Sequence, residues 1–392
     1  MENKSVHARI VIIIGLIIFI SWGFSKGEHL DMDSWQILGD RFYTNLQNQD
    51  YGGTHVASRY GVTILWMYVI AAGLSKVFIL DHILTFRTMV DVSLIVFLLS
   101  YVTIVVRGFR VKHSWQILYY VLLSPYVVAG LQLSTPADKF LTWFVALSVV
   151  TWVYVLVKND YRYIVITGVC IACTLLTKPA GLLLVPMLAV ITLYYSMVKK
   201  TKKFIIPLTK ALVIGGLIFY ISYPAMWVKP MEVLTSRVSS SAQIAVILPT
   251  ATDTLSVTGQ DWLEYILVFL RVDVIVVCGV CFFAYYFYKK IRRKMILDGI
   301  DLIGMAGFVY AMLILMVAFV LYDKEYGYII SERYVVPAVP LLTVFVIEKM
   351  VFVKKYLPVM FFINFYRLPA IQWLLRIGIV LLSGSVVGLP IW

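Results

Sequence analysis

IVITGVCIACTLLTKPAGLLLVPMLAVITLYY, from Ile164 to Tyr195, is apolar throughout except for one lysine, Lys178, which stands directly before Pro179. A helix needs about 17–25 apolar residues to cross a bilayer, so the segment and its flanks can form two short crossings. A lysine is costly at the centre of a membrane helix and much less so at an interface. We therefore predict a membrane hairpin of helices over 162–177 and 179–197, with Lys178 at the turn.

Apolar segments of this kind recur along the whole chain. The 392 residues are 61% hydrophobic and 14% charged, with a mean hydropathy of +0.89, whereas soluble proteins carry about 25% charged residues. The sequence predicts an all-α integral membrane protein, a polytopic helical bundle. We expect one transmembrane domain over residues 1–392, without a C-terminal soluble domain.

Basic residues are grouped between the apolar segments. The net charge is +13, and its basic residues lie in the links between apolar segments, as the positive-inside rule predicts for cytoplasmic loops. We therefore expect the clusters to share the cytoplasmic face, and we expect no nucleic-acid partner. These clusters are 107–112, 158–162, 199–203, 289–294 and 354–355. With the N-terminus cytoplasmic, the predicted crossings are 10–24, 88–106, 114–133, 140–157, 162–177, 179–197, 204–223, 265–287, 302–321, 335–352 and 371–391. The count is about eleven transmembrane helices.

The stretch 61–80 is apolar as well, but a crossing there would break the charge pattern. It contains Trp66 and Tyr68, and such side chains favour the headgroup region of a bilayer. We predict an interfacial helix inside a large first extracytoplasmic loop, about residues 25–87.

Three aspartates fall on the predicted outer face. Asp31 and Asp33 open the first loop, and Asp138 follows Pro136 at the start of a crossing. A carboxylate near an acceptor hydroxyl can act as a general base, and two carboxylates can instead hold a divalent cation. The alternatives are a solvated loop for Asp31 and Asp33 and helix capping for Asp138.

Two cations fall on the same face. Lys178 lies at the hairpin turn, and Arg333 precedes Tyr334 at the mouth of a crossing. The planar guanidinium of arginine matches phosphate oxygens and lysine adds a point charge, so the pair predicts an anion clamp. The alternatives are a plain turn residue for Lys178 and a solvated ion pair of Arg333 with Glu332 or Asp323.

These elements, in this order, resemble the GT-C superfamily of membrane glycosyltransferases over residues of about 10 to 345. Within that superfamily they resemble the branch of protein O-mannosyltransferases (dolichyl-phosphate-mannose-protein mannosyltransferases) and bacterial lipid A aminoarabinose transferase. The motifs that carry it are His29-Leu-Asp31-Met-Asp33, Asp138, Leu176-Thr-Lys178-Pro179, Pro224-Ala-Met-Trp227-Val-Lys-Pro230 and Arg333-Tyr334-Val-Val-Pro337-Ala-Val-Pro340.

The resemblance implies an inverting transfer of a sugar from a polyprenyl-phosphate donor to a lipid, glycan or protein acceptor. The reaction would occur on the extracytoplasmic face of a multi-pass membrane protein of the cell envelope, in the plasma membrane if the chain is bacterial. It implies catalytic roles for Asp31, Asp33 and Asp138 and phosphate binding by Lys178, Arg333 and Tyr334. A divalent metal ion on Asp31, Asp33 or Asp138 remains an open alternative.

The chain departs from the family pattern in two places. Met32 separates the two acids of the first motif, which leaves the choice of base between Asp31 and Asp33 open. Relatives often carry a histidine after the Pro-Ala-Met-Trp motif, where this chain has Ser239 to Ser241. A polytopic transporter and a non-catalytic relative that binds the carrier lipid are the alternative functions.

Overall fold

The computed structural model describes residues 32–56, 61–112, 117, 136–243, 274–293, 295–320 and 336–349. These residues are helical apart from short links, and none of them lies in a strand. The helices are α2 (Met32–Gln47), η1 (Gly52–Thr54), α3 (Val62–Phe78), α4 (His82–Phe109), α7 (Pro136–Lys158), α8 (Tyr163–Thr177), η2 (Pro179–Leu183), α9 (Leu184–Val198), α10 (Ile205–Ser222), α11 (Ala225–Val228), α12 (Pro230–Gln243), α14 (Val274–Arg292), α15 (Gly299–Val320) and α16 (Ala338–Lys349).

Four helical stretches in the described ranges are long and apolar enough to cross a membrane. They are His82–Phe109, Ala137–Lys158, Pro179–Val198 and Ile205–Ser222, and shorter apolar helices cover Val62–Phe78, Tyr163–Thr177 and Gly299–Ile314. The mostly helical membrane fold expected from composition is therefore confirmed. The count of eleven stays a prediction, because 10–24, 371–391 and nearly all of 114–133 lie outside the described residues.

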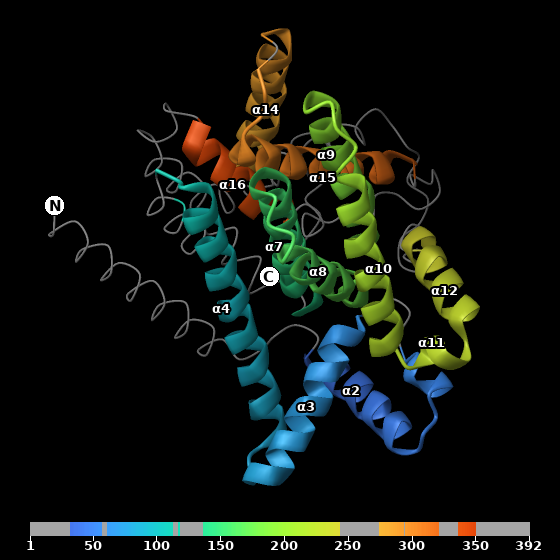
Figure 1. Ribbon diagram of the computed structural model, residues 1–392. Coiled ribbons are helices and arrows are strands. Elements are labelled where there is room, and N and C mark those ends of the chain that lie inside the picture. Colours follow the sequence, from blue (N-terminus) through green and yellow to red (C-terminus); the bar gives the residue numbers. More distant parts are fainter. Residues whose placement is uncertain are drawn as a thin grey trace, which may run out of the picture.

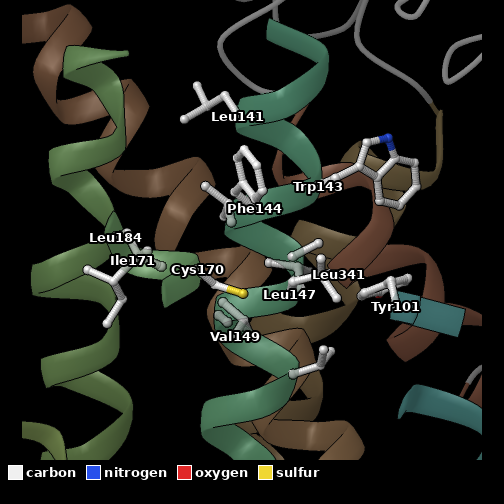
Figure 2. Packing of buried hydrophobic residues seen from close by; sticks show 14 of the residues in the cluster. Tyr101, Leu141, Trp143, Phe144, Leu147, Val149, Cys170, Ile171, Leu184 and Leu341 are labelled. Atoms are coloured by element: carbon white, nitrogen blue, oxygen red, sulfur yellow. The ribbon is translucent and has the colours of Figure 1, made fainter. Parts of the chain in front are cut away.

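Helix α7 is the central helix of the described bundle. Its sequence is apolar on all sides, which is typical of a helix surrounded by protein, and nearly all of its described side chains are buried. Figure 2 shows its residues packed against side chains of α4, α8, α9 and α16. Two hydrogen bonds link helices of this core. Trp152 Nε1 of α7 donates to Thr192 Oγ1 of α9 at 2.8 Å, and Tyr101 Oη of α4 donates to the Pro340 carbonyl of α16 at 2.7 Å.

The stretch expected at the membrane interface forms α3, and the crossing expected after it forms α4. Asp81 separates the two helices and caps α4, because its carboxylate accepts a hydrogen bond from the Leu84 amide at 2.6 Å. With 28 residues, α4 is longer than the hydrocarbon core of a bilayer, which is about 30 Å thick. The interfacial position of α3 stays a prediction.

The two ends of the bundle carry different elements. Figure 1 shows the C-terminal end of α4 and the link between α9 and α10 at the upper end of the view, whereas α2, α3 and α11 lie at the lower end. The basic clusters 107–112 and 199–203 therefore lie opposite the first loop. This agrees with the charge pattern, although the side of the membrane that each end faces stays a prediction.

A charge network around the buried Asp301 joins α14, α15 and α16. Asp301 is fully buried, its Oδ2 lies 2.9 Å from Lys290 Nζ, and its Oδ1 lies 3.2 Å from Lys349 Nζ. Lys349 Nζ also contacts Asp298 Oδ2 at 2.5 Å. Desolvation raises the pKa of Asp298, but the hydrogen bonds from Lys349 and from the Asp301 amide, together with the charges of Lys349 and Lys290, hold that pKa below its usual value.

Asp301→Ala removes a buried carboxylate and leaves two lysines without their common partner. We expect the free energy of unfolding to fall by about 1.5–3 kcal/mol, because the partly buried Lys290 and Lys349 lose a charged hydrogen-bond partner while Lys349 keeps Asp298. Unfolding titrations in mixed micelles measure this change. The matched control is Asp160→Ala, which breaks the exposed pair with Arg162 and should change the stability little. Equal losses in the two variants would contradict the structural role of Asp301.

Candidate functional site

The turn between α8 and α9 places Lys178 at the centre of the candidate site. Helix α8 ends at Thr177, and Lys178 is extended (φ −153°, ψ 152°) because the following Pro179 disfavours a helical conformation at this position. Pro179 then begins the short helix η2. Gly181 passes so close to α8 that a Cβ there would lie 2.5 Å from the Thr174 carbonyl oxygen. The turn between α8 and η2 is therefore tight, and it lies inside the protein.

Lys178 is buried at this turn and forms an ion pair with Asp138. Its Nζ donates a hydrogen bond to Oδ1 of Asp138, in the first turn of α7. The side chains are only 8% and 3% exposed, respectively. Buried charges are stable only when they are paired and hydrogen-bonded, and the N-terminal end of α7 further favours a carboxylate. A plain, solvated turn residue would not be buried in this way.

A second pair of opposite charges lies beside the first. Lys139 follows Asp138 on α7 and is only 4% exposed. It interacts electrostatically with Asp91 of α4, a helix that packs along α7. The start of α7 therefore collects two acids and two bases within one part of the bundle.

Helix α3 packs against the same hairpin. A Cβ at Gly61 would lie 2.0 Å from the Thr177 carbonyl oxygen, so only glycine allows the N-terminal end of α3 to come this close. Thr177 Oγ1 donates to Thr63 Oγ1 at 3.2 Å. Helix α3, which belongs to the predicted first loop, therefore contacts the residue that precedes Lys178.

A polar cluster joins η1 to the segment after α10. His55 Nδ1 lies 2.5 Å from Tyr223 Oη, and Ser236 Oγ lies 3.0 Å from His55 Nε2. Ser236 also donates to the Val233 carbonyl at 2.9 Å. Sequence reasoning found no histidine in the segment after the Pro-Ala-Met-Trp motif. The structure brings His55 to it from the first loop.

The structure describes only some of the predicted site residues. It brings Asp138 and Lys178 together. Asp33 lies in the first turn of α2, but its side chain is outside the described part, as are Asp31, Arg333 and Tyr334 altogether. The clamp of Lys178 with Arg333 therefore stays a prediction. Within the described ranges, no three histidine, cysteine or acidic side chains assemble into a group that could hold a metal ion.

No protein-family model and no curated protein matches the chain. The fold is similar to that of the archaeal oligosaccharyltransferase of Archaeoglobus fulgidus tethered to an acceptor peptide, with a TM-score of 0.50, 11% identity, and coverage of 90% of this chain and 50% of that one. A second structure of this enzyme, AglB in complex with an inhibitory peptide and a dolichol-phosphate, gives a TM-score of 0.49, 12% identity and coverage of 90% and 51%.

The chain spans about half the length of these oligosaccharyltransferase chains. At such low identity the likeness concerns the fold alone, and AglB is a member of the GT-C superfamily. The likeness agrees with the fold that the sequence motifs predicted, and membership of this chain in the GT-C superfamily stays a prediction. The narrower resemblance to protein O-mannosyltransferases is not confirmed.

His55→Ala removes the ring that bridges Tyr223 and Ser236. We expect a loss of about 1–2 kcal/mol of local stability, which corresponds to roughly 5–30-fold faster amide exchange in residues 52–56. Hydrogen exchange followed by mass spectrometry measures this. The control is Asn48→Ala, because the Asn48 side chain is exposed and should not affect exchange. Unchanged amide exchange in His55→Ala would show that the polar cluster does not stabilise residues 52–56.

Proposed function

We propose that the chain is an integral membrane glycosyltransferase with a single transmembrane catalytic domain over residues 1–392. It would transfer a sugar from a polyprenyl-phosphate donor to a lipid, glycan or protein acceptor on the extracytoplasmic face. The observation that carries the proposal is the buried Asp138–Lys178 ion pair at the hairpin of a GT-C-like fold. A buried ammonium at such a position is suited to bind a phosphate.

The solved oligosaccharyltransferase structures supply the chemical context. One complex contains a dolichol-phosphate and an inhibitory peptide, and the other contains a tethered acceptor peptide. A lipid-linked phosphate and a separate acceptor are the two ligands that a sugar transfer from a lipid carrier requires. These ligands support the same two classes for this chain, as part of the proposal.

The leaving group of the reaction is the carrier phosphate. As the bond between the anomeric carbon and the phosphate oxygen breaks, that oxygen gains negative charge, and a fixed cation stabilises it. Lys178 would supply this cation. An ammonium has three N–H donors, so it can bind Asp138 and a phosphate oxygen together, with Asp138 fixing its direction. Arg333 and Tyr334 would complete the phosphate site.

The acceptor must lose a proton as it attacks the anomeric carbon. In the proposed mechanism, Asp31 or Asp33 takes this proton, the new glycosidic bond forms, and the phosphate leaves on the opposite side of the sugar. The attack from the side opposite to the leaving group inverts the anomeric configuration.

A transporter is the second candidate function. It is favoured by one observation: Asp91 and Lys139 carry charges in helices that are long and apolar enough to cross a membrane. Charged side chains in such helices often line a pathway. The two functions differ in product, because a transporter moves its substrate unchanged, whereas a transferase converts labelled lipid-phosphate sugar into a labelled acceptor.

Replacing both Asp31 and Asp33 by asparagine should abolish transfer of a labelled sugar from polyprenyl phosphate. The charge is lost while the size is kept, so no base remains for the acceptor proton. The matched control is Glu232→Gln, which changes an exposed acid at the start of α12 and should keep wild-type turnover. Unchanged turnover in the folded double variant would remove the assignment of the base.

Lys178→Met should lower kcat about 10²–10³-fold, the range seen when a group that stabilises transition-state charge is removed. Lys229→Met, which removes an exposed lysine, is the control and should leave kcat near the wild-type value. Loss of kcat in both variants would contradict a specific role for Lys178. Binding of labelled lipid-phosphate sugar without any transfer by the wild-type protein would instead identify a non-catalytic carrier-binding relative.

A further inference from the structure

The Asp138 carboxylate is one of three acids that the sequence offers to a divalent metal ion. In the structure this carboxylate already has a cation, since its Oδ1 accepts a hydrogen bond from Lys178 Nζ and both side chains are buried. A metal ion that bound the same carboxylate would have to compete with this ammonium. It would also break the buried ion pair between Asp138 and Lys178, which is costly.

Two buried lysines, Lys178 and Lys139, also disfavour a divalent ion at this carboxylate. Among the described side chains, Lys178 pairs with Asp138, and Lys139, which follows Asp138 on α7, interacts with Asp91. Hard divalent cations bind where several oxygen ligands bring excess negative charge. Two further positive charges beside two buried lysines would be strongly repelled in a medium of low dielectric constant.

We propose that the Lys178 ammonium is the resident counter-ion of Asp138 and takes the position that a divalent metal ion would otherwise take on this carboxylate. Asp138 is then a positioning residue that holds Lys178, and sugar transfer requires no divalent ion at Asp138. The part that concerns transfer rests on the proposed function. The ion pair and its exclusion of metal do not.

Manganese binding tests the exclusion directly. The full chain, purified in lipid nanodiscs and stripped with a chelator, is titrated with Mn²⁺ while free Mn²⁺ is followed by electron paramagnetic resonance. We expect the wild-type protein and Asp138→Asn to give the same binding curve. A Mn²⁺ site that is present in the wild-type protein and lost in Asp138→Asn would overturn the proposal.

A double-mutant cycle tests the counter-ion role. Asp138→Asn and Lys178→Met should each lower the Tm, and the double variant should lose less than the two losses added together, because residues that contact each other are energetically coupled. The matched control combines Asp138→Asn with Asp160→Ala, beyond the far end of α7, for which we expect additive losses. Additive losses for Asp138 and Lys178 would contradict the pairing.

These measurements need neither donor nor acceptor. If the Mn²⁺ titration and the double-mutant cycle both give the expected results and no sugar transfer is found, the counter-ion inference stands and the proposed function falls. If Asp138→Asn loses a Mn²⁺ site while the wild-type protein transfers sugar, the function stands and the inference falls.

Discussion

Burying the ammonium of Lys178 is the constraint on which the candidate site depends. The hairpin breaks at Pro179, and the break leaves a lysine inside the protein at the junction of α8 and η2. Such a charge is tolerated only beside an opposite charge, and Asp138 provides it from the start of α7. The position of α7 relative to the hairpin is therefore tied to an electrostatic contact as well as to apolar packing.

Other elements converge on the same hairpin. Helix α3 approaches it through Gly61 and Thr63, and α12 packs against η2. Helix α12 is in turn linked to η1 through His55 and Ser236. The predicted first loop and the segment after α10 are thus connected to each other and to the turn that carries Lys178. The first loop and the segment after α10, which are far apart in the sequence, therefore both lie around the buried charge of Lys178.

The sequence predicted the helices well because hydropathy and basic clusters are local signals. The hairpin around Lys178 and the helix that begins near Asp138 were expected at nearly the observed positions. The pairing of Asp138 with Lys178 was not predicted, because a contact across 40 residues depends on how α7 packs against α8. The approach of His55 to Tyr223 spans 168 residues and has no sequence motif. A single loop histidine gives no sign of its partner.

The most direct test of the account is a cryo-electron microscopy structure of the full chain in nanodiscs with a polyprenyl phosphate. The account predicts a phosphate oxygen within about 2.7–3.2 Å of Lys178 Nζ, while the ammonium still contacts Asp138. A phosphate bound more than about 4 Å from Lys178, with the Asp138–Lys178 pair intact, would contradict the role of this lysine in binding the carrier.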